Sequence, residues 1–182
     1  MVMLFPGLPS ASDALLALGW LSLMLAYSPV ADLIGRRVVG EPPRLATFRG
    51  LQQDWRRFLM GILVAWALGG FLEEIVFRGI VLQWIEALLT PLLGWIGVVV
   101  AVCAAAFGAG VVHLYQGPRG ALIVGQLSVL FGVLYVVSGH DIWAVVLCHG
   151  LYDTIAFVRF ARKESRYSRI NNSATDMTAG TI

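Results

Sequence analysis

The chain has 182 residues, of which 58% are hydrophobic and 13% are charged, with a formal net charge of +2 and a mean hydropathy of +0.79. Soluble domains carry about 25% charged residues, so this composition excludes an ordinary soluble domain. It favours an all-α fold, that of a polytopic helical membrane protein. The net charge gives no argument for nucleic-acid binding, because the basic residues lie mostly in segments that flank the apolar runs.

Apolar runs predict about five transmembrane helices. The first 35 residues contain no Lys or Arg, whereas a secretory signal begins with a positive region, so we interpret the first run as a retained helix. The second run is too long for one simple crossing, and Gly69 and Gly70 are expected to kink or divide it. The runs are residues 14–30, 58–89, 92–115, 121–137 and 142–160.

Basic residues cluster in three regions, which five spans would place on one side of the membrane. These regions are the loop 36–57, Arg119, and the C-terminal end from Arg159 onward. The positive-inside rule then predicts that the N-terminus is outside and the C-terminus inside. We expect the bacterial cytoplasmic membrane, with residues 1–57 as an N-terminal helix and basic cytoplasmic loop, 58–161 as the helical core, and 162–182 as a polar, disordered cytoplasmic tail.

Ionisable side chains occur within or at the ends of these apolar runs. Each costs roughly 3 kcal/mol in a membrane even on mild insertion scales, so a chain keeps such groups where they pair, face water or do chemistry. Glu74 and Arg78 are four residues apart and face each other on a helix. Glu73 points about 100° away from Glu74, so the two carboxylates can have separate roles. The candidate site residues are Glu73, Glu74, Arg78, His113, His149 and Asp153.

Helix geometry indicates whether these groups can meet. Glu73 and His113 lie at matching depth on a hairpin around Pro91, roughly 25–30 Å from the turn. His149 and Asp153 share one helix face and lie about 10 Å nearer the outer side, an offset that helix tilt can absorb. The spacing therefore supports one shared site.

Each element also has a purely structural interpretation. The Glu74–Arg78 pair can simply hold helices together. His113 can be an interfacial residue near a helix end, and His149 with Asp153 can form a buried structural pair. The conjunction of all three elements in this order is harder to explain by packing alone.

Taken in order, the motifs resemble the CPBP family, which comprises the CAAX proteases and bacteriocin-processing enzymes that are also called Abi proteins. The matching residues are Glu73-Glu74-x-x-x-Arg78, then His113 closing an apolar helix, then His149-x-x-x-Asp153. The resemblance covers residues 58–160. It implies an intramembrane endopeptidase of the glutamic type, similar to the type II CAAX prenyl endopeptidases.

The chain departs from the family pattern in two ways. The family usually places a Phe four residues before the second-motif His, where this chain has Ala109. Family members often have more spans than we expect here, so helices that embellish the site or admit substrate are missing. The second departure bears on the substrate class more than on the chemistry.

The resemblance implies a role for each residue of the first two motifs. Glu73 is the general base, and it activates water together with His113. Glu74 and Arg78 form a pair that fixes the helix and shapes the local field. Peptide hydrolysis needs these parts because water must be made nucleophilic inside a membrane.

His149 is implied to donate a hydrogen bond to the tetrahedral oxyanion. Asp153 either donates as well, which requires a protonated carboxyl group, or orients His149. Two His and two or three carboxylates are also a plausible Zn ligand set. No His-Glu-x-x-His pattern occurs, and by resemblance to the glutamic-type members we expect no metal cofactor, with Zn as the alternative.

The leading hypothesis is thus hydrolysis of a peptide bond in a membrane-anchored protein or peptide. The expected partners are that substrate and the lipid bilayer, with no nucleic acid. One alternative is a catalytically inactive immunity or scaffold protein of the same fold. Another is a transporter or proton relay, although no repeat of spans supports it.

Overall fold

The computed structural model describes residues 7–44 and 54–179, with side chains described up to Arg162. Every regular element in this part of the chain is a helix, which confirms the expected all-α class. The elements are α1 (Ala11–Val38), α2 (Trp55–Val64), the π-helices η3 (Ala65–Glu73) and η4 (Ile75–Leu82), α3 (Gln83–Leu93), α4 (Trp95–Val112), the 3-10 helix η5 (His113–Gln116), α5 (Gly117–Val137) and α6 (Ile142–Ala179).

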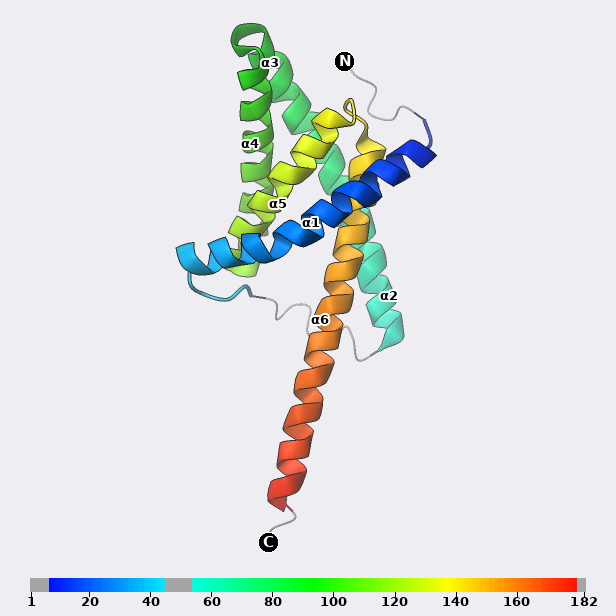
Figure 1. Cartoon of the computed structure of the whole chain (residues 1–182), viewed down its shortest axis with the longest axis vertical. Coiled ribbons are helices and arrows are strands. Elements are labelled where there is room, and N and C mark those ends of the chain that lie inside the picture. The colour runs from blue at the N-terminus through cyan, green and yellow to red at the C-terminus, as the bar shows by residue number, and fades with distance from the viewer. Residues whose placement is uncertain (1–6, 45–53, 180–182) are drawn as a thin grey trace.

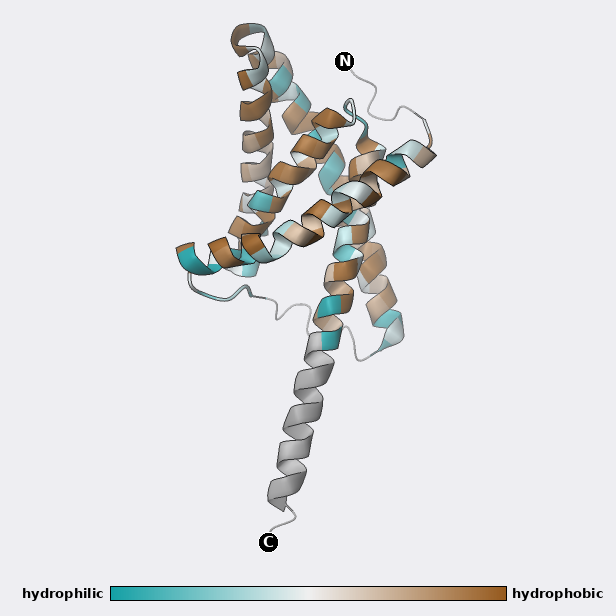
Figure 2. Ribbon diagram, viewed as in Figure 1, coloured by the Kyte–Doolittle hydropathy of each residue, from teal (hydrophilic) through white to brown (hydrophobic). Residues whose placement is uncertain are grey.

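Four helical stretches of the described chain are long and apolar enough to cross a membrane. They are Ala11–Val38, Trp55–Leu93, Trp95–Val137 and Ile142–Arg162. The fold is therefore that of a helical membrane protein, and hydrophobic residues run along all of these stretches (Figure 2). The expected spans 92–115 and 121–137 correspond to the single stretch Trp95–Val137, within which α4 and α5 are separate helices.

The helices α4 and α5 of that long stretch lie side by side (Figure 1). The 3-10 turn η5 and Gly117 join them, and the chain reverses its direction there. Gly117 has a φ of +85°, a left-handed conformation that favours glycine. This turn places His113, its first residue, at the end of α4.

Helix α1 is longer than the run 14–30 that predicts it. It begins after a capping box in which the Asp13 amide donates to Ser10 Oγ at 3.2 Å and the Ser10 amide donates to Asp13 Oδ2 at 2.7 Å. It passes Pro29 and ends with Arg36 and Arg37 in its last turn, where cations favour the helix dipole. In Figure 1, α1 crosses in front of α5 and α6. Apolar side chains of these three helices form the core together with residues of α4 and Leu82 of η4.

The second long run forms one helical stretch, Trp55–Leu93, so the chain is not divided at Gly69 and Gly70. The helix changes from α to π across Ala65–Glu73 and again across Ile75–Leu82. Gly70 packs against α6, because a Cβ atom built on it would lie 3.3 Å from the Gly150 Cα atom. A Cβ atom on Gly150 would lie 2.5 Å from the Trp66 ring. Small residues thus let the backbones of η3 and α6 approach closely.

The end of α6 differs from the expected disordered tail. The backbone is helical as far as Ala179, whereas the sequence predicts a disordered tail from residue 162 onward. No Gly or Pro occurs between Gly150 and Gly180, so no residue with a strong helix-breaking tendency ends α6 earlier.

Candidate active site

Glu74 and Arg78 form a buried ion pair at the junction of η3 and η4. Glu74 is 0% exposed and Arg78 is 1% exposed. Arg78 Nη1 donates to Glu74 Oε1 at 3.2 Å, and Arg78 Nε lies 3.2 Å from Glu74 Oε2. The pairing expected from their spacing is therefore present. Each charge offsets the cost of burying the other.

Arg78 is held from a second helix as well. Its Nη2 atom donates to the Ser128 carbonyl oxygen at 2.8 Å and to Ser128 Oγ at 2.6 Å. Its guanidinium carbon lies 5.4 Å from the centre of the Phe131 ring, within range of a cation–π contact. Ser128 is not among the predicted site residues, and its one signal in the sequence is a hydroxyl group within the apolar run 121–137.

His149 joins this buried pair from α6. Its Nδ1 atom lies 2.5 Å from Glu74 Oε1, and its ring stacks on Phe131 with centroids 4.5 Å apart. These two contacts fix the orientation of the imidazole. Its other nitrogen, Nε2, lies 3.6 Å from Asp153 Oδ2, so the expected neighbourhood of His149 and Asp153 is also present.

Glu73 faces a different partner from that of Glu74. Its Oε1 atom lies 3.7 Å from His113 Nε2. His113 Nδ1 lies 2.8 Å from the Ala109 carbonyl oxygen, which can only accept, so Nδ1 carries the hydrogen. In the neutral ring Nε2 is then a free acceptor directed towards Glu73. Ala109, the departure from the family pattern, orients His113 through its backbone.

The site therefore has a buried tier and an open tier. The buried tier consists of Glu74 and Arg78, with side chains 0% and 2% exposed. The open tier retains access to the outside of the packed helices, since its side chains are between 12% and 27% exposed. Its members are Glu73, His113, His149 and Asp153.

The structure thus brings the six predicted site residues together around η3. The predicted offset of about 10 Å along the helices does not keep His149 away from Glu74. The close crossing of η3 and α6 at Gly70 and Gly150 brings the two helices into contact.

A metal ion does not fit this arrangement. Among the described residues, no group of three or more His, Cys, Asp or Glu side chains is placed to hold one. Glu74 Oε1 already contacts both Arg78 and His149. We therefore derive no catalytic step from a metal, and the expected absence of a metal cofactor stays a prediction.

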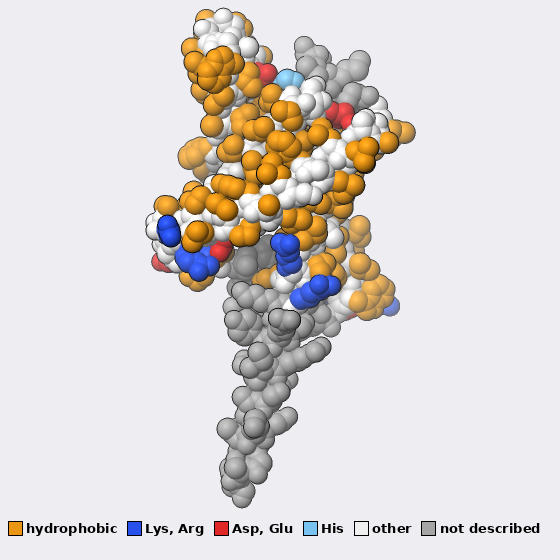
Figure 3. Space-filling view, viewed as in Figure 1, with side chains coloured by type: hydrophobic (Ala, Val, Ile, Leu, Met, Phe, Trp, Pro, Cys, Tyr) orange, Lys and Arg blue, Asp and Glu red, His pale blue; other side chains and the backbone are white. Residues whose placement is uncertain are grey.

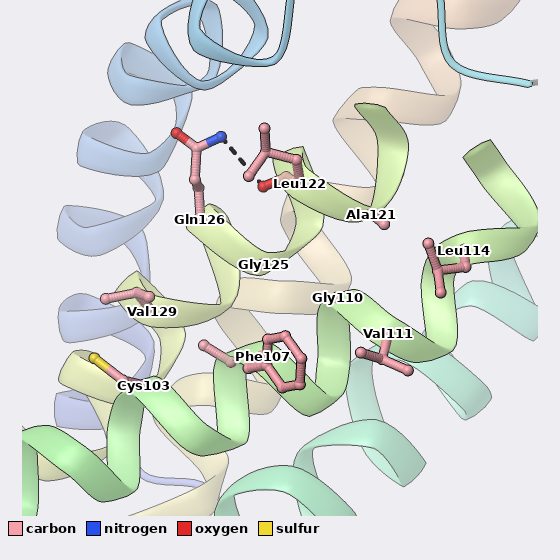
Figure 4. A pocket seen from close by; sticks show the side chains of 11 residues that line it. Cys103, Phe107, Gly110, Val111, Leu114, Ala121, Leu122, Gly125, Gln126 and Val129 are labelled. Carbon is pink, nitrogen blue, oxygen red and sulfur yellow. Dashed lines mark hydrogen bonds between the residues drawn. The ribbon is translucent and has the colours of Figure 1, made fainter. Parts of the chain in front are cut away.

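A pocket of about 570 Å³ opens between α4 and α5. Figure 4 shows its apolar and small lining residues, among them Phe107, Gly110 and Gly125. None of the six predicted site residues lines it. The pocket is therefore separate from the candidate chemistry.

A second ionisable pair joins α3 to the loop before α6. His140 Nε2 lies 2.9 Å from Glu86 Oε2, and the edge of the Tyr135 ring meets the His140 ring. His140 has a φ of +67°, which is uncommon for a residue with a side chain. The pair ties this loop to α3.

Comparison with known proteins adds one finding. A family model described as type II CAAX prenyl endopeptidase, Rce1-like, matches residues 55–155. This range is more than half of the chain and includes all six site residues. No curated protein and no solved structure matches the chain.

Proposed function

The chain belongs to the Rce1-like family of type II CAAX prenyl endopeptidases, and from this membership we propose that it hydrolyses a peptide bond in a membrane-anchored protein or peptide. The observation that carries the proposal is the open pair of Glu73 and His113, directly beside the buried tier. A carboxylate and an imidazole acceptor that share an opening are suited to activating water.

Glu73 and His113 are separated by a distance that one water molecule can bridge. A water about 2.8 Å from each atom is compatible with the 3.7 Å between Glu73 Oε1 and His113 Nε2. In the proposed step Glu73 takes a proton from this water molecule. At the same time the oxygen atom of the water bonds to the carbonyl carbon of the substrate. The same proton then passes to the amide nitrogen as the carbon–nitrogen bond breaks.

His149 is proposed to stabilise the oxyanion of that intermediate. Its Nδ1–H bond is directed at Glu74, so donation to the substrate falls to Nε2. Both nitrogens donate only when the ring is an imidazolium. The buried carboxylate of Glu74 stabilises such a cation. The imidazolium of His149 would be a second positive charge beside that of Arg78, and the carboxylate of Asp153, 3.6 Å from Nε2, balances it.

We also propose that the C-terminus faces the cytoplasm of a bacterial cell. On the face drawn in Figure 3, the Arg side chains, in blue, gather across the lower part of the described helices, at the level where α1 ends. The positive-inside rule places that end in the cytoplasm. A green fluorescent protein fused to the C-terminus should therefore fluoresce in a bacterial host, and a periplasmic phosphatase fused there should be inactive; the reverse pattern contradicts the orientation.

The function is tested by comparing protein termini in membranes of the native host by mass spectrometry. Wild type is compared with Glu73→Gln, which keeps the side-chain shape and removes the base. Glu86→Gln is the matched control, since Glu86 lies in the same helical stretch and pairs with His140 outside the site.

We expect termini near a membrane anchor that disappear in Glu73→Gln and persist in Glu86→Gln. Identical termini in all three strains, with each protein inserted at the normal level, would contradict proteolysis. That result would favour the catalytically inactive immunity or scaffold function. Such a protein needs only the buried pair of Glu74 and Arg78, which holds its helices together.

A further inference from the structure

The pocket between α4 and α5 is open to the surroundings of the helices, and its lining is mostly apolar. Phe107, one of the lining residues, is 75% exposed, and Val111 is 45% exposed. Gln126 also lines the pocket, but its side-chain amide already has partners. Its Nε2 atom donates to the Leu122 carbonyl oxygen at 3.2 Å (Figure 4), and its Oε1 atom accepts from the Tyr27 hydroxyl at 3.2 Å. The lining therefore favours an apolar occupant.

The pocket starts beside the turn between α4 and α5 and follows both helices. Leu114 lines it next to this turn, and Cys103 lines it eleven residues earlier in the chain, which is about 16 Å at the rise of a helix. One leaflet supplies about 15 Å of the hydrocarbon core of a membrane. A transmembrane helix of a partner crosses both leaflets, so it would extend well beyond the pocket. The length of the pocket therefore matches a lipid tail in one leaflet.

Arg side chains lie at the end of the pocket that is nearest the turn. A Cβ atom built on Gly117 would lie 3.4 Å from Arg44 Cγ, and the Arg44 amide donates to the Gln116 carbonyl oxygen at 2.7 Å. Arg119 lies in the first turn of α5, two residues before Ala121, which lines the pocket. Apolar lining and basic side chains therefore meet at this end.

This end of the pocket keeps an excess of positive charge. Arg36 and Arg119 share the carboxylate of Asp32, with Nη2 atoms 3.1 Å from Oδ2 and 2.6 Å from Oδ1. One carboxylate cannot balance both guanidinium groups. Figure 3 shows blue Arg side chains where α1 ends. The charged residues of the segments 32–44 and 117–120 are Arg36, Arg37, Arg44 and Arg119 against Asp32 and Glu41.

We propose that this pocket binds an anionic phospholipid, with one tail between α4 and α5 and the headgroup phosphate beside Arg44. Basic residues at the membrane surface attract anionic lipids, and the planar guanidinium group matches the geometry of a phosphate. The inference goes beyond the proposed function and stands without it, since it needs neither Glu73 nor proteolysis.

The test is native mass spectrometry of the purified full-length chain in detergent, which counts the lipids that each chain retains. The probes are dioleoyl phosphatidylglycerol, which is anionic, and dioleoyl phosphatidylcholine, which has the same tails and no net charge. We expect one phosphatidylglycerol per chain at saturation. Phosphatidylcholine should bind at least about fivefold more weakly, because one Arg near the membrane surface contributes about that factor to the binding of an anionic lipid.

Arg44→Gln tests the headgroup end of the pocket. Arg44 is exposed, so this variant should fold. It should bind phosphatidylglycerol about fivefold more weakly and phosphatidylcholine as wild type does. The matched control is Arg56→Gln, because Arg56 lies on α2, which packs against η3 and α6, and its lipid binding should be unchanged.

Gly125→Leu tests the tail end. A Cβ atom on Gly125 would lie 3.7 Å from the Ala106 carbonyl oxygen, an ordinary contact, and Leu favours a helix more than Gly does. The variant should therefore fold, and the rest of its side chain should fill the pocket and abolish binding of the single lipid. Gly19→Leu is the control, since a Cβ atom on Gly19 meets nothing within 4 Å.

The results that would overturn the proposal differ for its two parts. Equal affinity for the two lipids, or unchanged binding of phosphatidylglycerol by Arg44→Gln, overturns the headgroup assignment. Unchanged binding by Gly125→Leu overturns the pocket as the place of the tail. Dimers that disappear in Gly125→Leu would show that a second copy of the chain occupies the pocket in place of a lipid.

Discussion

Glu73 and Glu74 are adjacent in the chain, but their carboxylates have different surroundings. Glu73 is 27% exposed and faces His113, whereas Glu74 is fully buried against Arg78 and His149. One residue is therefore free to react and the other is committed to holding three helical elements together. This division leads to separate predictions for activity and for stability.

Replacing Glu74 should destabilise the protein much more than replacing Glu73. Glu74→Gln leaves Arg78 buried without its anion, and breaking one partner of a buried pair typically costs about 3–5 kcal/mol. Glu73→Gln removes no such contact. Thermal unfolding of the purified proteins in detergent measures both changes, and equal midpoints for the two variants would contradict the two-tier description.

Ser128 should be a positioning residue that acts through Arg78. Ser128→Ala removes the hydroxyl contact at 2.6 Å but keeps the carbonyl contact. A hydrogen bond to a charged group is worth about 1.5–3 kcal/mol, so we expect a loss of stability in that range.

Ser22→Ala is the matched control for Ser128→Ala. Ser22 Oγ donates to the Leu18 carbonyl oxygen within an exposed part of α1. Its unfolding midpoint should stay near that of wild type. A similar loss in both variants would show that any buried or membrane-facing serine has this effect, and Ser128 would then have no special role.

Asp153→Asn distinguishes the two roles left open for this residue. If Asp153 stabilises the imidazolium of His149, removing its charge weakens the oxyanion donor. The loss of one such donor typically lowers the rate by about 100-fold or more, and we expect a fall of this size in the rate at which substrate termini appear. Retained or increased activity would instead support a direct hydrogen bond from residue 153 to the oxyanion.

Purified protein should contain no stoichiometric Zn, because the described donor groups do not converge on one point. Elemental analysis of the detergent-solubilised protein tests this directly, and proteolysis should survive a strong chelator. One Zn per chain that is lost in His113→Ala would contradict the metal-free mechanism.

Contacts within one helix could be predicted from the sequence. The Glu74–Arg78 and His149–Asp153 neighbourhoods follow from a spacing of four residues, and the separation of Glu73 from Glu74 follows from the rotation of about 100° per residue. The apolar runs likewise indicate helices because a membrane leaves a backbone few alternatives. The order of the motifs was sufficient to identify the family that the comparison confirms.

Contacts between helices depended on the tertiary structure. No sequence spacing indicates that Ser128 and Phe131 of α5 hold Arg78 and His149, since their positions depend on how far α5 slides and turns against η4 and α6. His149 reaches Glu74 because η3 and α6 cross closely at Gly70 and Gly150. Local geometry therefore determined which residues could act, and helix packing decided which partners they meet.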